Sequence, residues 1–281
     1  MFRSLLKHVA IAAVILAAPW GWAEAASSDR VAYTLTDPSR PASVKAHLLN
    51  GSVTVKGNDG KEVIVEAHVR GSERSERSER SENEGGGMHR IPQTATGLSV
   101  DADNNEVVVR VDAIQRTIDL TITVPRKTSL SLRTVNDGNI VVSDVDGEID
   151  INDLNGQVTL NHVAGSAVVS ALNGRVKVSL DRVDPQKSMA FSSLNGDIDV
   201  TFPPDIKADL SMRTDNGEIY SDFDIQLQPE APQQTVEDER GKGGHFRVRI
   251  DKTVHAKLNG GGPEIRFKGF NGNIYIRKAG K

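Results

Sequence analysis

Glycine recurs at every ninth position in the middle of the chain, and this spacing constrains the fold more than any other feature. The series is Gly138, Gly147, Gly156, Gly165 and Gly174. The positions two and four residues after each glycine hold small or branched apolar residues, whereas the position between them varies from aspartate to lysine. Such alternation is typical of a short strand with one buried face. The repeat therefore predicts one strand and one corner in every nine residues.

Asparagine or aspartate often precedes the repeated glycine. Glycine tolerates positive φ without steric cost, and Asn and Asp are the next most tolerant residues. Asn-Gly pairs also favour β-hairpins, so a meander is an alternative. A strict period that repeats the same inward columns instead favours coils stacked on coils. The position seven after the glycine belongs to these columns, with Val145, Leu154, Val163 and Leu172.

Leu-Asn-Gly recurs at 154–156 and 172–174, which indicates two strands and about 18–20 residues per coil. We therefore expect an all-β fold, a single-stranded, β-helix-like β-solenoid with coils about 4.8 Å apart. Looser copies near both ends extend the predicted domain over residues 26–281. Glycine is expected to turn the corners at Gly51, Gly138, Gly147, Gly156, Gly165, Gly174, Gly196, Gly217 and Gly272.

Two segments do not fit the repeat. Residues 71–90 contain a charged Ser-Glu-Arg repeat followed by glycines, with almost no apolar residue to bury, and are expected to form a disordered loop insertion. That loop is either a charged tether or partner site, or a neutral expansion. Residues 227–245 are expected to form a second loop.

The N-terminus has the pattern of a secretory signal peptide. Arg3 and Lys7 precede an apolar run over 9–18, and Ala-Glu-Ala follows at 23–25. The run is shorter than the roughly 20 residues that span a membrane. We therefore predict a signal peptide over residues 1–25, cleaved near Ala25, with a retained anchor as the alternative. The chain is expected to be exported to the periplasm or the cell surface, with no transmembrane segment after cleavage.

The composition argues against several kinds of site. The net charge of -4 gives no basic excess for nucleic acid, and the absence of cysteine excludes disulfides and thiolate chemistry. Each nonapeptide has one glycine, unlike the calcium-binding G-G-x-G-x-D-x-U-x repeat. Asp144 and His162 would stack on neighbouring coils, but such a pair indicates a surface hydrogen bond rather than a metal site. We predict no metal and no cofactor.

Tyr220 and Tyr275 each lie three residues after a corner glycine. This shared register predicts that they form either a surface contact patch for a sugar or a protein, or ordinary cross-strand packing. The basic segments 246–250 and 265–270 could face an anionic membrane surface or polymer, although ordinary charge alternation explains them equally well. Glycoside cleavage would need two carboxylates across a bond. The outward carboxylates are interpreted as solvated surface charges: Asp150, Asp153, Asp197, Asp199 and Glu218.

The corner motifs also carry a family resemblance. LNGQVTL, LNGDIDV, TDNGEIYS and the C-terminal LNGGGPEIRFKGFNGNIYIRK resemble the bacterial putative-adhesin domains of unknown function, which are toastrack-like β-solenoids. The resemblance covers roughly residues 31–281 apart from the Ser-Glu-Arg loop. It implies a β-helix-like fold and an envelope-associated binding or scaffolding role, and it implies no catalytic residues.

Two functions are consistent with these features. The first is an adhesin-like binding or scaffolding protein of the cell envelope that performs no catalysis. The alternative is a carbohydrate-active enzyme, a polysaccharide lyase or hydrolase, on a β-helix fold. The partner would be an envelope protein or a glycan, and self-association through the ends of the stack stays open.

Overall fold

The fold is all-β, as predicted. The computed structural model describes residues 28–70, 96–112, 116–136, 138–228, 234–239, 245–250 and 252–280. These residues form twenty-two strands, of which twenty belong to one sheet and two to a separate sheet. Within these ranges, no helix has the length and hydrophobicity needed to cross a membrane. The predicted signal peptide and the Ser-Glu-Arg loop lie outside the described residues.

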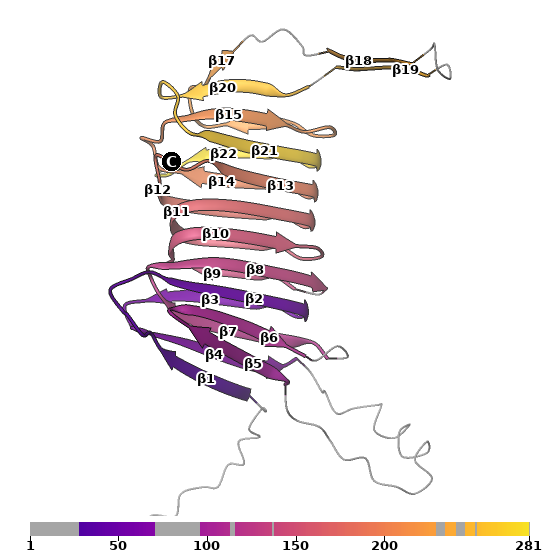
Figure 1. Cartoon of the computed structure of the whole chain (residues 1–281). Helices are drawn as coiled ribbons and strands as arrows, with labels where there is room; N and C mark the ends of the chain where they lie inside the picture. Colours follow the sequence, from indigo (N-terminus) through magenta and orange to yellow (C-terminus); the bar gives the residue numbers. More distant parts are fainter. Residues whose placement is uncertain are drawn as a thin grey trace, which may run out of the picture.

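The strands of the main sheet stack in two facing rows (Figure 1). Row one contains, in spatial order, β5 (Leu98–Asp103), β6 (Glu106–Val111), β2 (Ala42–Asn50), β8 (Thr128–Asn136), β10 (Asp146–Asp153), the second half of β11 (Val158–Asn173), β13 (Met189–Asn195), β21 (Glu264–Asn271), β15 (Ala208–Arg213), β20 (Val254–Leu258) and β17 (Gln226–Gln228). Row two contains β1 (Ser28–Thr34), β4 (Glu62–Val69), β7 (Ile118–Pro125), β3 (Val53–Asn58), β9 (Ile140–Ser143), the first half of β11, β12 (Val176–Val183), β14 (Ile198–Phe202), β22 (Ile274–Lys278) and β16 (Ile219–Ser221). The long strand β11 bends from row two into row one and so joins the rows into a single sheet.

Between β8 and β14, each row is parallel and follows chain order. Ile149 of β10 pairs with Leu130 of β8 on one side and with Ala167 of β11 on the other, so paired strands are one predicted coil apart. The Asn155-Gly156 corner leads from row one to row two. The hairpin alternative is therefore wrong at this corner.

Chain-order stacking does not extend over the whole predicted domain. β2 lies between β6 and β8, and β21 lies between β13 and β15. Antiparallel pairs occur towards both ends, including β5 with β6 and β15 with β20. Antiparallel strands thus form three of the four row ends, β1, β5 and β17, and the parallel strand β16 forms the fourth.

The segment expected to form a second loop, 227–245, contains a strand. β18 (Gln234–Glu239) pairs antiparallel with β19 (His245–Ile250) in the separate two-stranded sheet. Its polar composition suggested a loop, but alternating residues such as those of Thr235–Val236–Glu237 suit a strand as well.

The core lies between the two rows and consists of the alternating inward side chains. In β7, for example, Ile118, Leu120, Ile122 and Val124 are all buried, whereas the residues between them are partly exposed. An aromatic cluster at β13, β14 and β21 forms part of this core. Phe191 stacks on Phe267 with ring centroids 5.5 Å apart, and Phe202 meets both rings edge-on. Burying a side chain of this kind contributes about 1.5–3 kcal/mol.

The corner glycines are required mainly because stacked backbones approach closely. A Cβ atom on Gly156 would lie 1.9 Å from the carbonyl oxygen of Gly138, and one on Gly174 would lie 1.7 Å from that of Gly156. Positive φ, the reason expected from the sequence, occurs at only four of the nine predicted positions: Gly51, Gly165, Gly196 and Gly272. At the other five, the contact with the neighbouring strand excludes a side chain.

An asparagine ladder runs beside these glycines along the edge towards which β2, β8, β13 and β21 point (Figure 1). Each side chain donates from Nδ2 to Oδ1 of the next, at 2.7–2.9 Å over most of the ladder and 3.2–3.5 Å at its β2 end. In order of donation the members are Asn216, Asn271, Asn195, Asn173, Asn155, Asn136 and Asn50. The ladder holds seven strand ends in register.

Candidate functional site

The structure brings Tyr220 and Tyr275 together on the outer face of row two. They are directly paired in the parallel β16–β22 register, and both side chains point outward. Their rings stack with centroids 5.2 Å apart and planes inclined by 8°. The Tyr220 side chain is 47% exposed. The shared spacing from a corner glycine therefore predicted a real juxtaposition, and the pair presents an aromatic surface to solvent.

Polar groups surround the tyrosine pair. The Tyr220 hydroxyl donates to Glu218, and this hydrogen bond raises the pKa of Tyr220. Nδ2 of Asn273 donates to the Tyr275 hydroxyl at 3.0 Å. The Arg277 guanidinium lies 5.2 Å from the Tyr275 ring centroid and donates to Asp199 at 2.7 Å. Aromatic faces bordered by fixed donors and acceptors can bind a sugar ring or a protein side chain. We call Glu218, Tyr220, Tyr275 and Arg277 the tyrosine surface.

The carboxylates predicted to face outward mostly have partners within the protein. Asp197 accepts from Arg175 at 3.2 Å and from the backbone N–H of Asn273 at 2.9 Å. Asp199 is bound by Arg277, and Glu218 by Tyr220. The bonds of Asp197 and Asp199 link neighbouring coils along row two, so these two carboxylates hold the stack together as well as contributing charge. The bond between Glu218 and Tyr220 is local.

Asp153 differs from this group because its side chain points inward. It is only 5% exposed, and it accepts a hydrogen bond from the Thr134 hydroxyl. Burial raises the pKa of its carboxyl group. The prediction that Asp153 is a solvated surface charge is therefore wrong, because Asp153 continues the inward alternation of Ile149 and Ile151 to the end of β10. Asp150 lies on the outer face, where Asn152 donates to it at 3.5 Å.

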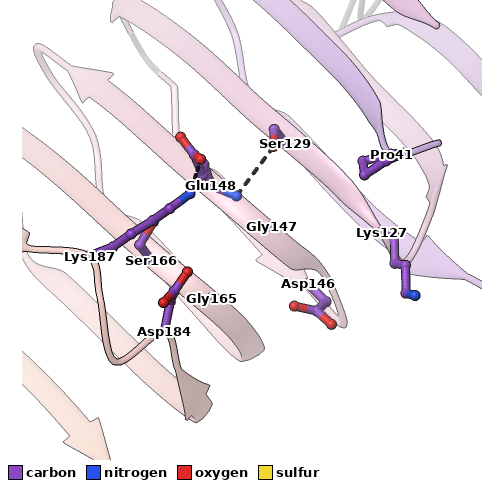
Figure 2. Close-up of a pocket in the computed structure, with 10 residues that line it drawn as sticks. All are labelled: Pro41, Lys127, Ser129, Asp146, Gly147, Glu148, Gly165, Ser166, Asp184 and Lys187. Atoms are coloured by element: carbon purple, nitrogen blue, oxygen red, sulfur yellow. Dashed lines mark hydrogen bonds and ion pairs between the residues drawn. The ribbon is translucent and has the colours of Figure 1, made fainter.

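A shallow polar depression lies over β8, β10 and the bend of β11, and the sequence did not predict it (Figure 2). Lys187 crosses it to bind Glu148, which raises the pKa of Lys187. The backbone N–H of Glu148 donates to the Ser129 hydroxyl at 3.4 Å. Gly147 and Gly165 form part of the lining, and their recurrence is the only sequence signal for the depression. Lys187 and Glu148 neutralise each other across the depression, which favours a structural role.

The pair suggested by stacking, Asp144 and His162, does not form. Nδ1 of His162 lies 3.2 Å from Asp181, whereas the nearest charged partner of Asp144 is Arg126 at 3.9 Å. In the described ranges, no group of three or more His, Asp or Glu side chains is placed to hold a metal ion.

The comparisons with known proteins concern the fold. No family model matches the chain, and no curated protein matches it. Among solved structures, the chain is similar to a putative cell adhesion protein from Clostridium sporogenes ATCC 15579, with 10% identity, a TM-score of 0.38, and coverage of 89% of this chain and 99% of that one. It is also similar to putative adhesins from Bacteroides fragilis NCTC 9343, with 12% identity, a TM-score of 0.34 and coverage of 89% and 96%, and from Parabacteroides distasonis ATCC 8503, with 10% identity, a TM-score of 0.26 and coverage of 90% and 97%. These solved structures thus carry the same description as the family that the corner motifs resemble.

Proposed function

We propose that the chain is an exported cell-envelope protein that binds a glycan or an envelope protein through its outer surface, in the manner of an adhesin or scaffold, without catalysis. The N-terminal pattern supports export to the periplasm or cell surface. The parallel rows from β8 to β14 support a single-stranded solenoid as the architecture of the regular part. A stack of this kind offers long faces that suit extended partners.

The tyrosine surface is the observation that carries the proposal. Two stacked rings lie near the end of row two, where β16 pairs with β22 alone among the described strands. Arg277, Glu218 and Asp199 fix donors and acceptors around the rings. Exposed aromatic side chains are enriched at binding sites because they supply large contact area with little loss of conformational entropy.

The alternative, a carbohydrate-active enzyme, requires a general acid and a second carboxylate on either side of a sugar bond. Around the tyrosine surface, Asp199 is neutralised by Arg277 and Asp197 by Arg175. Each of these carboxylates is thus engaged by an arginine of the protein, whereas a general acid must be placed against the glycosidic oxygen of a bound substrate. The geometry at this surface therefore supports binding better than hydrolysis.

Binding to envelope components tests the proposal directly. The chain, purified after export, is sedimented with isolated peptidoglycan sacculi, and intact cells are crosslinked and analysed for protein partners. We expect the chain either to sediment with the sacculi or to crosslink to one protein partner. Replacing both rings, Tyr220→Ala with Tyr275→Ala, is expected to abolish whichever of these two interactions the wild-type chain shows. Leu227→Ala is the matched control, because Leu227 is 65% exposed and lies away from the tyrosine surface.

Two results would contradict the proposal. One is a wild-type chain that neither sediments with sacculi nor yields a stoichiometric crosslinked protein. The other is retention that survives the double tyrosine substitution unchanged, which would remove the tyrosine surface from the function. Release of sugar fragments from sacculi by the purified chain would instead support the enzyme.

A further inference from the structure

A row of apolar side chains that are exposed, or half-buried in the case of Val135, runs along one edge of the stack, immediately before the asparagine ladder. We call it the corner ridge, and its members are Leu49, Val135, Leu154, Leu172, Leu194 and Phe270. The exposed fractions of the four leucines and the phenylalanine lie between 38% and 48%. The pairing register places the ridge on six neighbouring strands, so it spans about 24 Å.

The side chains of the ridge are not part of the hydrophobic core. The neighbouring inward positions are filled by Ala171 and Ser193, which are buried, and the leucines alternate with them on the outside. Monomeric proteins seldom expose apolar side chains in a continuous row, and such a row marks an interaction site. Because the asparagine ladder fixes the strand ends, the ridge is straight and is formed before any partner binds.

A second column of outward side chains lies two residues before the ridge on the same face. From one end to the other its members are Arg110, His47, Arg133, Asn152, Ser170, Ser192, Lys268 and Arg213. The column contains cations at both ends and no carboxylate. Arg213 is paired with Asp215 at 3.0 Å and Arg110 with Asp101 at 2.9 Å, which leaves Arg133 and Lys268 as the column's main source of positive charge. Burial together with Arg133 and Arg110 lowers the pKa of His47. We call this row the basic column.

The ridge and the column border the same two depressions. One is lined by Leu49, Arg110 and Arg133, together with Asp112, and the other by Leu194, Lys268 and Phe270, together with Asp215. Each depression therefore combines an apolar wall with a polar wall that holds two basic side chains and one carboxylate, with Arg110 and Arg133 in one and Arg213 and Lys268 in the other. An anionic headgroup attached to an apolar chain matches both walls.

We propose that this edge of the stack docks on an anionic phospholipid surface, with the corner ridge at the headgroup–acyl boundary and the basic column against the lipid phosphates. Leucine and phenylalanine beside arginine and lysine are the composition of interfacial membrane-binding elements. Basic side chains near an anionic leaflet strengthen binding through attraction to the lipid phosphates. This surface is separate from the tyrosine surface, so the inference goes beyond the proposed function.

Charge and area disfavour a second copy of the chain as the occupant. Two copies meeting through this edge would bring like-charged columns close together. The partly exposed ridge side chains also offer less area than the roughly 800 Å² per partner of a stable interface. A soluble anionic polymer would engage the basic column but would gain little from the leucines.

Vesicle sedimentation tests the inference. The chain, purified after export, is mixed with phosphatidylethanolamine vesicles that contain or lack phosphatidylglycerol. We expect binding to the anionic vesicles only, weakened by salt. Leu172→Ser with Leu194→Ser is expected to weaken it about tenfold or more. Arg133→Glu with Lys268→Glu is expected to do the same. The controls are Val168→Ser, which removes an apolar side chain 47% exposed outside the ridge, and Lys177→Glu on row two.

Three outcomes would overturn the inference. The first is a wild-type chain that does not bind anionic vesicles, and the second is binding that the leucine substitutions leave unchanged. The third is a wild-type dimer in sedimentation velocity that becomes a monomer in the leucine variant, which would make the ridge a self-interface. Circular dichroism melting of each variant establishes that it is folded. Failure here leaves sacculus binding intact, and failure of sacculus binding leaves vesicle binding intact, so the two proposals are tested separately.

Discussion

Nδ2 of Asn173 lies 2.8 Å from Oδ1 of Asn155, and Oδ1 of Asn173 lies 2.7 Å from Nδ2 of Asn195. Each asparagine in the middle of the ladder thus donates to one coil and accepts from the next. A side-chain amide is suited to this role because it is both donor and acceptor. The ladder therefore links seven neighbouring corners on this edge through the same chemical group.

Removing one central amide should weaken the stack measurably. Asn173→Ala deletes two ladder hydrogen bonds, so we expect the free energy of unfolding to fall by about 1–2 kcal/mol. Urea denaturation measures the loss. Asn161→Ala is the matched control, since Asn161 lies on β11 outside the ladder. Equal effects of the two substitutions would show that the ladder does not stabilise the fold.

Gly174 tests the close approach of stacked corners. A Cβ there would lie 1.7 Å from the Gly156 carbonyl oxygen, so Gly174→Ala should destabilise by about 4 kcal/mol or more, or prevent folding. Gly260 has a φ of +92°, and a Cβ added there would have no atom within 4 Å, so Gly260→Ala should cost only about 1–2 kcal/mol. Thermal melting of the two variants compares the loss of stability caused by the steric contact at Gly174 with the loss caused by backbone strain at Gly260. A mild Gly174→Ala variant would mean that neighbouring coils can separate at little cost.

Asp153 should contribute to the stability of the fold in acid and lose that contribution as the pH rises. Because burial raises the pKa of its carboxyl group in the folded state, the folded protein binds a proton at a higher pH than the unfolded chain does. This group therefore favours folding below its unfolded-state pKa, and that contribution is lost as the pH rises through its folded-state pKa.

Asp153→Asn removes this titration while an amide oxygen can still accept from Thr134. We expect the variant to be about 1 kcal/mol more stable than wild type at neutral pH and to show less difference in acid. Melting temperatures across the acid range measure the effect. Asp150→Asn, on the outer face, is the control. A variant that is less stable than wild type at neutral pH would indicate that the ionised carboxylate is stabilising here.

The stacked tyrosines should be coupled in stability as well as in binding. Rings with centroids 5.2 Å apart and nearly parallel planes are expected to interact by about 0.5–1.5 kcal/mol beyond their separate contributions. A double-mutant cycle with Tyr220→Ala, Tyr275→Ala and the pair measures this coupling. Additive effects would mean that the rings are only neighbours.

Much of the regular structure follows from the sequence because the information is local. The period of nine residues places strands and corners, and alternation assigns the faces of Ile149, Ile151, Val158 and Leu160 correctly. The tyrosine register follows from the same period. The position seven after the glycine is less uniform than expected, since Val145 and Val163 are buried whereas Leu154 and Leu172 are exposed.

This difference in burial arises because the two pairs of residues lie on different edges of the stack, which the sequence of a single repeat does not reveal. Successive nonapeptides end on different edges of the stack, and at the asparagine edge the chain turns with the leucine on the outside. Sequence spacing treats both edges alike, so it could not reveal the corner ridge, whereas the inward position of Asp153 follows from the alternation of Ile149 and Ile151. Likewise, the basic column joins β6 and β2 to β21 and β15, which are far apart along the chain.

The sequence by itself determined the strand-and-corner unit, because alternation and glycine act within a few residues. Only the tertiary structure decided which units lie side by side. Every Leu-Asn-Gly corner can stack on any other, so the repeat leaves the order of the coils undetermined. In the assembled sheet β21 lies beside β13, where Phe191 packs against Phe267, and β2 lies beside β8. Core volume and edge coverage are properties of the assembled sheet, and no single repeat contains them.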